Sequence, residues 1–344
     1  MPHPVLMFSC MRNEGASVLE WFAYHRMIGV DHFLIYTNNC EDGTDRMWLH
    51  LQKLGLATHR KNRANGTLRQ AKAQTRALIR SMEDPVFQGA DWVVFLDVDE
   101  FLNIHAGEGR IGDLLAANAG SDCILINWRL FGCSGHVSDA PGLVTETLVA
   151  ACDPERAASN YAMSMKSLFR RARFLKAGIH RPQVHPEDSL PRVFTNPSGE
   201  AVSPAWRHVT RNWDYRTAQI NHYSVPSLES VMMKFARGFT NPMDGPIAYL
   251  RNRDTNHVED RTIQRHLPRL RAEVARLMED PVLRSLHEEA VAWRRARIAE
   301  ALAVPENRAM LAALAEESAR LASAPPDAAT APSGEALARL GLTG

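Results

Sequence analysis

The segment that decides the fold is Trp92-Val93-Val94-Phe95-Leu96-Asp97-Val98-Asp99-Glu100-Phe101-Leu102, in which three carboxylates separate two apolar runs. A short apolar run before polar residues is typical of a strand that is buried in a parallel sheet. Alternate side chains of a strand share a face, so we expect Asp97 and Asp99 to point the same way and Val98 to enter the core. Ligands of open parallel sheets bind at the carboxyl ends of strands. The segment therefore predicts a ligand site with two carboxylates.

Similar apolar runs alternate with helical patterns along the chain. Strands are predicted at residues 5–11, 30–36, 123–130 and 218–223. Helices are predicted from Ser17, with Glu20 completing a capping box, at residues 45–54 and at residues 67–82. Strand and helix in alternation predict an α/β fold, a mostly parallel sheet flanked by helices with right-handed crossovers.

The chain is expected to have three parts. Residues 1–240 are predicted to form the α/β domain, and residues 241–322 a helical C-terminal region with boundaries at Pro268, Pro281 and Pro305. Residues 323–344 are rich in Ala, Pro and Ser, which predicts a flexible tail.

Composition excludes several classes of protein. Of 344 residues, Lys and Arg number 40 and Asp and Glu 39, a balance that gives no overall field to attract nucleic acid, so no nucleic-acid partner is expected. The five cysteines are scattered without a CxxC pair, which argues against a zinc site and a disulfide framework. Without a basic, apolar leader or a run of about 20 apolar residues, the chain is expected to be cytoplasmic, with peripheral contact at the inner face of a membrane left open.

The carboxylate pair favours a metal site. Adjacent carboxylates repel each other and are costly to desolvate, and a divalent cation removes both problems. Oxygen ligands suit Mn²⁺ or Mg²⁺, which keep positions for water and substrate phosphates. An ordinary solvated strand end is the plain alternative. A phosphatase of the haloacid dehalogenase type also places Asp-x-Asp after a strand, but it prefers Thr or Val where this chain has Phe101.

Several segments together resemble family 2 glycosyltransferases, and in particular the branch described as family 2-like or family 92-like. Residues 8–14 resemble the first strand and nucleotide loop of that group, residues 37–44 its D-D/N-x-S-x-D-G-T loop, and residues 97–101 its metal-binding D-x-D. The branch also has R-N-E, E-W and N-H-Y segments, matched here at residues 12–14, 20–21 and 221–223. The likeness covers roughly the first 240 residues and departs at Thr37, where an acidic residue usually contacts the base.

The resemblance implies a GT-A fold and transfer of a sugar from a nucleotide-sugar donor, UDP being the common nucleotide and galactose the sugar suggested by family 92. The acceptor would be a carbohydrate or a lipid-linked glycan. Asp97, Asp99 and His222 would hold the metal. The candidate nucleotide- and donor-binding residues are Arg12, Asn13, Glu14, Asn38, Asp42, Arg69, Gln70, Lys72, Asp97 and Lys166. For residues 69–72 a solvated helix face is the alternative, and for Asp42 a plain turn.

Family 2 enzymes invert the anomeric centre and need a carboxylate as general base for the acceptor hydroxyl. The candidates are Glu187 and Asp188, in a proline-rich segment that could form an acceptor lid; Glu100, Asp214, His180 and His185 are rivals. Two other functions stay open: a phosphoryl- or nucleotidyl-transfer enzyme that uses the same aspartates, and a sugar-nucleotide-binding scaffold without catalysis.

Overall fold

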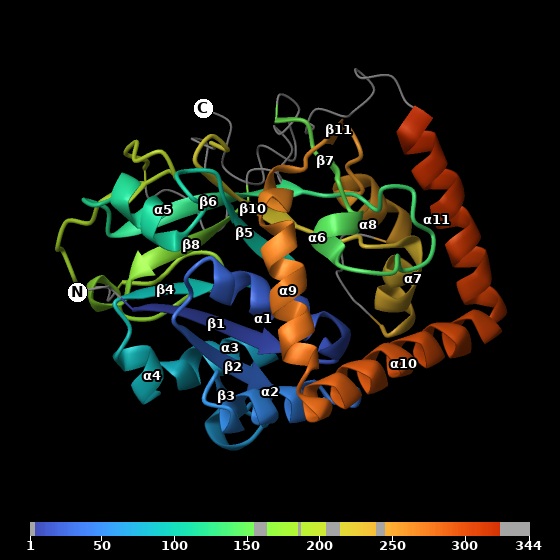
Figure 1. Ribbon diagram of the computed structural model, residues 1–344, viewed down its shortest axis with the longest axis horizontal. Helices are drawn as coiled ribbons and strands as arrows, with labels where there is room; N and C mark the ends of the chain where they lie inside the picture. The colour runs from blue at the N-terminus through green and yellow to red at the C-terminus, as the bar shows by residue number, and fades with distance from the viewer. Residues whose placement is uncertain (1–3, 155–163, 185–186, 204–213, 239–244, 324–344) are drawn as a thin grey trace. The chain divides into compact units, whose positions relative to one another are not determined.

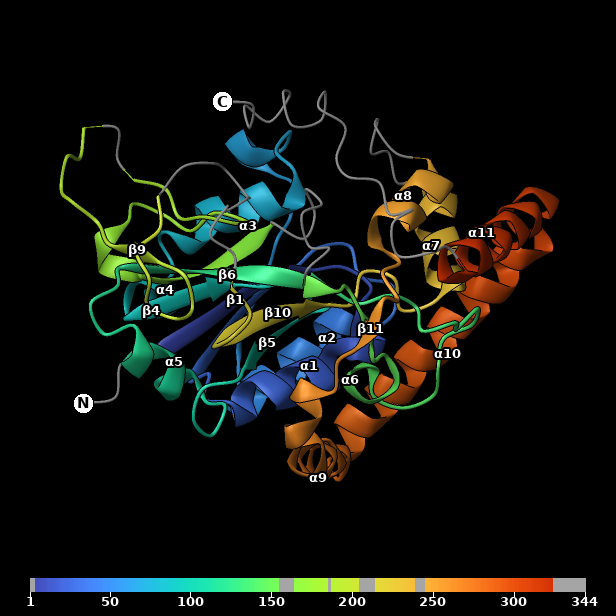
Figure 2. The same cartoon turned by 90° about the horizontal axis from the view of Figure 1, so that it is seen from above.

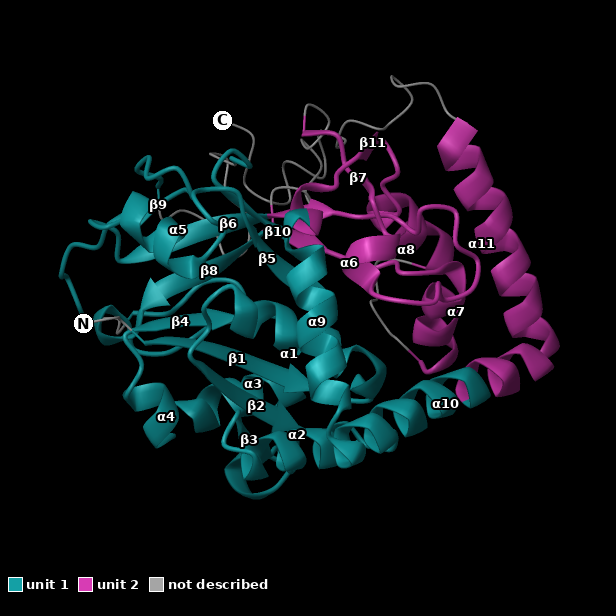
Figure 3. Ribbon diagram, in the orientation of Figure 1, with its two compact units in different colours: residues 1–127, 165–220, 265–296 teal, residues 128–164, 221–264, 297–344 magenta. Residues whose placement is uncertain are grey.

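The computed structural model describes residues 4–154, 164–184, 187–203, 214–238 and 245–323 (Figure 1). The chain divides into two compact units, each built from separate stretches of sequence (Figure 3). Unit 1 comprises residues 1–127, 165–220 and 265–296, and unit 2 comprises residues 128–164, 221–264 and 297–344. The predicted division at residue 240 is a different one and stays a prediction, and the predicted tail lies almost wholly outside the described residues.

A mixed sheet is the centre of unit 1, which confirms the α/β fold class. Among the described residues the strand order is β3-β2-β1-β4-β8-β6-β10-β5, with β9 paired to β6. The strands are β1 (Val5–Met11), β2 (His32–Thr37), β3 (Thr58–Lys61), β4 (Trp92–Phe95), β5 (Glu100–Ile104), β6 (Cys123–Leu130), β8 (Met165–Arg170), β9 (Phe194–Thr195) and β10 (Ala218–His222). The last residues of β6 and β10 belong to unit 2.

The first four strands of that order are parallel, as the sequence predicts. β1 pairs in parallel with both β2 and β4, and β2 pairs in parallel with β3. β8 runs antiparallel to β4 and β6, so the sheet as a whole is mixed. The chain moves from β1 to β2 and β3 on one side and returns to place β4 on the other side of β1. The carboxyl ends of β1 and β4 therefore meet at a topological switch point, where such sheets bind ligands.

Helices cover both faces of this parallel part (Figure 2). Helix α1 (Gly15–Met27) and helix α2 (Thr44–Lys53) lie on one face, and α3 (Ala73–Ser81) lies on the other. The alternation of β1 explains the division: Leu6 and Phe8 enter a core with Ala77 and Leu78 of α3. On the α1 face, the ring of Phe22 lies 4.7 Å from that of Phe33.

Two helix predictions require correction. Helix α1 begins at Gly15 rather than after Ser17, because the carboxylate of Asp42 accepts a hydrogen bond from Gly15 N at 2.8 Å. The helix predicted over residues 67–82 is broken: a short 3₁₀ turn at Gly66–Leu68 precedes α3, which begins at Ala73. Smaller helices of unit 1 are α4 (Pro85–Gln88), α5 (Ile111–Ala117) and α9 (Leu267–Met278), and the last packs against α1.

Unit 2 is mainly helical. Its elements include α6 (Val144–Thr147), α7 (Leu228–Ala236), α8 (Pro246–Arg253), α11 (Pro305–Ser323) and the pair β7 (Ala150–Ala151) with β11 (Val258–Glu259). Helix α10 (Pro281–Ala303) begins in unit 1 and ends in unit 2. Pro281 and Pro305 open their helices, as the sequence predicts, since proline suits the first helical position. None of the helices in the described part of the chain is long and apolar enough to cross a membrane.

Candidate active site

Three strand ends gather the predicted nucleotide residues at one edge of the sheet. Met11, the last residue of β1, is paired with Thr37, the last residue of β2. Leu96, directly after β4, donates its N–H to Phe8 O of β1 at 3.2 Å. Asn13, Asn38 and Asp97 each follow one of these strands, so the structure brings them to the carboxyl edge of the parallel strands.

Asp97 is held by a buried lysine. Lys166 Nζ lies 2.9 Å from Asp97 Oδ2 and 3.0 Å from Glu100 Oε2, and the side chains of Lys166 and Glu100 are fully buried. Glu100 Oε2 also accepts a hydrogen bond from Asp97 N at 2.9 Å. Burial alone would lower the pKa of Lys166, but the charges and hydrogen bonds of Asp97 and Glu100 outweigh it and raise the pKa. The lysine therefore stays charged and holds two carboxylates in one place.

Two neutral side chains complete this cluster. Gln74, in the first turn of α3, donates to Asp97 Oδ1 at 3.0 Å. Trp21 Nε1 of α1 donates to the carbonyl oxygens of Asp97 and Glu100, at 3.1 and 3.0 Å. Trp21 is fully buried, so its indole N–H binds the backbone of the turn between β4 and β5 from the protein interior. The sequence contains Trp21 in the E-W segment, but a role for it, and for Gln74, becomes visible only in the fold.

Asp97 and Asp99 are both half-buried and Val98 is buried, as the sequence predicts for Val98, whereas the buried position of Glu100 was not predicted. That the two aspartates point the same way stays a prediction. They lie after β4, at the start of a turn rather than within a strand. Among the described residues no three His, Cys, Asp or Glu side chains form a group that could hold a metal ion. Carboxylate oxygens are ligands that Mg²⁺ and Mn²⁺ accept in ones or twos, with substrate phosphates and water completing the shell, so a metal at Asp97 and Asp99 stays a prediction.

The loop after β2 is fastened to the start of α1. Asp42 is buried, and besides Gly15 N it accepts hydrogen bonds from Thr44 N and Thr44 Oγ1, at 2.9 and 2.6 Å. Thr44 Oγ1 in turn accepts from Glu14 N at 2.9 Å. Asn13, in the left-handed region at φ 58°, accepts from Glu41 N at 2.8 Å. Asp42 thus shapes the loop, and its direct contact with a nucleotide stays a prediction.

Beside this loop, the strand ends of β1, β2 and β3 carry polar side chains that contact each other. Thr37 is buried, and its Oγ1 lies 2.7 Å from His59 Nε2. Cys10 donates to Asn38 Oδ1 at 3.6 Å and accepts from Asn62 Nδ2 at 3.5 Å. Burial raises the pKa of the Cys10 thiol to about 11, although the hydrogen bond from Asn62 opposes the shift, so this cysteine stays neutral.

The other predicted contacts lie around this edge. Arg12 is exposed and lies 3.6 Å from Glu41. Arg69 and Gln70 are exposed in the turn before α3, and Lys72 is the residue that precedes its first turn, so the predicted placement of all three on a helix is wrong. They belong instead to the entry of the helix whose Gln74 contacts Asp97.

His222, the predicted third metal ligand, ends β10 and belongs to unit 2, whereas Asp97 and Asp99 belong to unit 1. It is mostly buried, and its ring lies 4.3 Å from the ring of Trp128. Its role as a metal ligand stays a prediction.

The candidate general bases differ in their burial and in the hydrogen bonds and ion pairs that they make. Glu100 is fully buried against Lys166 and is therefore a poor candidate. Asp188 accepts from Leu190 N and pairs with Arg192, and these contacts lower the pKa of its carboxyl group. For Asp214, burial opposes the shift, but hydrogen bonds from Arg216 and Ser198 lower the pKa. Glu187 is exposed. The ring Nδ1 of His180 lies 3.0 Å from Met165 O, and His185 lies outside the described residues.

In a comparison with protein families, the model of glycosyltransferase family 92 matches residues 9–266. The chain belongs to glycosyltransferase family 92. The matched range contains the Asp97–Glu100 turn, Lys166 and the Asn-His-Tyr segment, and the resemblance stated from the sequence is thereby confirmed.

Curated relatives support the same family. A glycosyltransferase family 92 protein of Ricinus communis is 29% identical over 123 residues, which cover 31% of this chain and 18% of that protein. One of Oryza sativa subsp. japonica is 29% identical over 120 residues, covering 33% of this chain and 18% of that protein. The chain therefore spans about a fifth of the length of these relatives. A solved structure of S. aureus TarS, residues 1–349, is 12% identical with a TM-score of 0.34, covering 85% of this chain and 92% of that chain.

Proposed function

We propose that this member of family 92 is a glycosyltransferase that moves the sugar of a UDP-sugar donor to a carbohydrate or lipid-linked acceptor, with inversion at the anomeric carbon. The observation that carries the proposal is the pair Asp97 and Asp99 at the switch point of the sheet, with Asp97 fixed by the buried Lys166. Nucleotide-binding α/β folds place their ligands at this position of the sheet.

Asp99, with Asp97 beside it, would hold Mn²⁺ or Mg²⁺ against the diphosphate. The ion would supply a Lewis acid that stabilises the negative charge of the leaving diphosphate. The protein's own contribution is to keep the carboxylates in place. Lys166 and Gln74 hold the two oxygens of Asp97, and the Trp21 indole holds the backbone of the same turn. A preformed arrangement of this kind avoids reorganisation during the reaction.

Transfer by direct displacement forms one bond to the anomeric carbon and breaks one. The acceptor hydroxyl oxygen attacks the anomeric carbon, the bond from that carbon to the diphosphate oxygen breaks, and its electron pair leaves with UDP. The hydroxyl proton passes to a general base. Glu187 is the better candidate of the predicted pair, because the backbone N–H of Leu190 and the guanidinium of Arg192 hold the pKa of Asp188 below its ordinary range and weaken it as a base.

The test is product analysis with a panel of UDP-sugars that includes UDP-galactose, in Mn²⁺ and in EDTA. We expect slow release of UDP and free sugar that requires the metal and is lost in Asp99→Asn. Release of inorganic phosphate or pyrophosphate would indicate phosphoryl or nucleotidyl transfer instead. Binding of UDP without any turnover, with or without an added glycan acceptor, would indicate a scaffold.

A further inference from the structure

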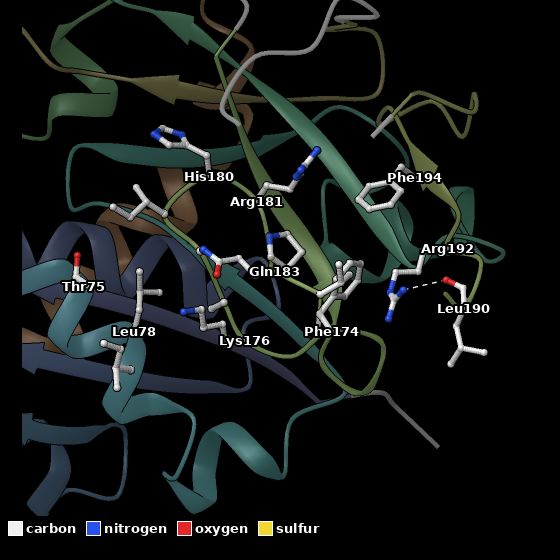
Figure 4. Close-up of a pocket in the computed structure, with 16 residues that line it drawn as sticks. Thr75, Leu78, Phe174, Lys176, His180, Arg181, Gln183, Leu190, Arg192 and Phe194 are labelled. Atoms are coloured by element: carbon white, nitrogen blue, oxygen red, sulfur yellow. Dashed lines mark hydrogen bonds between the residues drawn. The ribbon is translucent and has the colours of Figure 1, made fainter. Parts of the chain in front are cut away.

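In unit 1, helix α3 and the segment of residues 174–194 cover the same face of the sheet (Figure 2). Leu78 of α3 belongs to one apolar core with Phe174 and Ala177 of this segment. A cavity of about 790 Å³ opens between them, and Figure 4 shows Leu78 at one end of it and Leu190 at the other. Helix and segment therefore form one layer, on the opposite face of the sheet from α1 and α2.

The 174–194 segment exposes large aliphatic side chains. Four of the nine large apolar side chains that are exposed in the described part of the chain lie there: Leu175 (45%), Val184 (41%), Leu190 (60%) and Val193 (47%). An antiparallel bridge pairs Lys176 with Gln183, so Leu175 and Val184 lie opposite each other on one face of this pairing. Apolar side chains that gather on one part of a surface mark an interaction site.

Hydrogen bonds hold the stretches of this segment together. Arg192 Nε donates to Arg173 O at 2.6 Å, and Arg173 Nη2 donates to Pro191 O at 2.6 Å. Leu175 N donates to Gln183 O at 2.8 Å. The stretches that carry the exposed aliphatic side chains therefore lie side by side.

The chain that leads into α3 and through it is strongly basic. From Arg60 to Arg80 the sequence has seven Lys or Arg residues and no Asp or Glu. Four of the seven are exposed: Lys61, Arg63, Arg69 and Lys72. Whereas Arg60 pairs with Asp84, none of these four pairs with a carboxylate in the described part of the chain. Exposed cations without such partners give this part of unit 1 a positive field that attracts an anionic partner.

The basic chain is held against α3. Asn62 Nδ2 donates to Ala73 O at 2.8 Å, and Arg80 Nη1 donates to Asn62 Oδ1 at 2.9 Å. Arg80 Nη2 also donates to Arg63 O at 2.8 Å. Figure 2 shows the turn before α3 and the 174–194 segment on the same side of the sheet. The exposed cations and the exposed aliphatic side chains therefore lie on one side of unit 1.

We propose that this side of unit 1 docks on a lipid bilayer that carries anionic headgroups. The exposed leucines and valines enter the boundary between headgroups and acyl chains, and the cations lie among the headgroups. A bilayer suits this surface because its charge is spread over many headgroups, so the cations need not converge on one point.

A nucleic acid fits this surface less well. Single strands are bound by aromatic rings on which the bases stack, together with cations. The large apolar side chains that are exposed in the described part of the chain are all Leu or Val. Aliphatic side chains beside cations match the two chemical zones of a bilayer surface instead.

Co-sedimentation with vesicles tests the docking. The probes are vesicles of phosphatidylcholine alone and of phosphatidylcholine mixed with phosphatidylglycerol. Binding to the mixed vesicles is expected to be at least about tenfold tighter than to phosphatidylcholine, and to weaken as salt is added. Equal binding to both kinds of vesicle would overturn the role of the cations. The absence of binding to the mixed vesicles would overturn the proposal.

The cations are tested by Lys61→Gln/Arg63→Gln. This variant is expected to bind the mixed vesicles about tenfold or more weakly, because it removes two charges from the surface that meets the headgroups. Arg46→Gln/Lys53→Gln is the matched control, since it removes one Arg and one Lys from α2, on the other face of the sheet. The control is expected to bind as wild type does. Equal losses in both variants would contradict the assignment to this side of unit 1.

The aliphatic side chains are tested by Leu175→Ser/Leu190→Ser. Binding to the mixed vesicles is expected to weaken about tenfold, because less apolar surface enters the bilayer. Leu49→Ser/Leu54→Ser is the control: these leucines, in α2 and directly after it, are 39 and 44% exposed. Urea unfolding of all the double variants checks that they fold. Unchanged binding in folded Leu175→Ser/Leu190→Ser would overturn the bilayer as partner and point to a soluble polyanion such as RNA.

The docking and the proposed reaction fail separately. Asp97→Asn/Asp99→Asn is expected to bind the mixed vesicles no more weakly than wild type, because neither aspartate belongs to the docking surface. If UDP binds and the vesicles do not, the docking surface is wrong and the donor site stands. If the vesicles bind and UDP does not, the docking surface stands and the proposed function fails.

Discussion

Lys166 Nζ lies 2.9 Å from Asp97 Oδ2, although the side chain of Lys166 is 0% exposed and that of Asp97 is 30% exposed. The lysine thus reaches from the interior to a carboxylate at the surface of the site. A buried ammonium group is tolerated only when it is paired, and here Asp97 and Glu100 both pair with it. This contact links the stability of the sheet to the position of the carboxylates that the proposed function needs.

Replacing the lysine should therefore affect both properties. Lys166→Met leaves Glu100 buried without its cation, and the free energy of unfolding is expected to fall by roughly 3–5 kcal/mol. Adding Glu100→Gln should recover part of this loss, because the buried charge is then removed. Urea unfolding of the single and double variants measures both effects. The exposed Lys53→Met should change stability by less than about 0.5 kcal/mol. An equal loss in the single and double variants would contradict this account.

Trp21 offers a test of the turn that carries Asp97. Trp21→Phe removes the N–H that holds the carbonyl oxygens of Asp97 and Glu100, so UDP affinity is expected to fall several-fold. Trp48→Phe is a matched control, because Trp48 is equally buried but its Nε1 has no hydrogen-bond partner among the described residues. Both substitutions remove the same ring volume. A difference between the melting temperatures of the two variants therefore reports the hydrogen bonds of Trp21 rather than the loss of packing. If both variants bind UDP equally well, the indole N–H has no part in the site.

Gly15 should not tolerate a side chain, although glycine is a weak helix former. A Cβ at Gly15 would lie 2.7 Å from Ala290 Cβ and 3.1 Å from Asp42 Oδ2, in a closely packed region. Gly15→Ala is expected to lower the free energy of unfolding by about 1–3 kcal/mol through overpacking. Gly112→Ala, where a Cβ meets nothing, is the control and should stabilise α5 by up to about 1 kcal/mol. Equal effects of the two substitutions in urea unfolding would argue against this close approach.

The buried ring of His25 is expected to make the protein less stable in acid. Its Nδ1 lies 2.9 Å from Trp21 O, and its Nε2 accepts a hydrogen bond from Leu102 N at 3.2 Å, so a second ring proton has no place. Burial lowers the pKa of His25 to about 3, although the hydrogen bond to Trp21 opposes the shift. The folded ring thus stays neutral below pH 6.5, where the unfolded one gains a proton.

The direction in which stability changes with pH follows from that difference in bound protons. Below pH 6.5 the unfolded chain binds more protons than the folded one, so stability falls as the pH falls, down to about pH 3. Each such histidine contributes about 1.4 kcal/mol per pH unit. Burial also lowers the pKa of His266, to about 4, and should add to the effect. Urea unfolding between pH 7 and pH 5 measures the slope, which His25→Gln should reduce by about one proton. A variant with an unchanged slope would contradict this assignment.

The parallel part of the fold was predictable because its signals are local. The apolar runs at β1, β2 and β4 are each bounded by polar residues. Outside the sheet, the prolines that open α10 and α11 mark helix starts directly. The place of β8 between β4 and β6 was not predictable, since strand order and direction depend on pairing between residues far apart in sequence. The start of α1 was missed for the same reason, because the carboxylate that accepts a hydrogen bond from its first N–H, Asp42, lies 27 residues further along the chain.

The residues of the candidate site also differ in whether the sequence or only the fold reveals them. Asp97 and Asp99 stand out in the sequence because charge interrupts an apolar run. Glu100 was considered as a base, and the fold shows that it is a buried partner of Lys166, a relationship that spacing along the chain does not reveal. Gln74 lies in a polar stretch of the sequence where nothing distinguishes it from its neighbours, and only the packing of α3 brings it to Asp97.

The most direct test of the central claim is calorimetric titration of the protein with UDP in Mn²⁺, repeated in EDTA and on Asp97→Asn/Asp99→Asn. Glu83→Gln, an exposed carboxylate elsewhere, is the control. The account predicts that UDP binds wild type and Glu83→Gln alike in Mn²⁺. It predicts that affinity falls at least about tenfold in EDTA and in the double variant, as expected when charged contacts to the diphosphate are lost. UDP binding of equal strength in the folded double variant, or no binding to wild type at all, would contradict it.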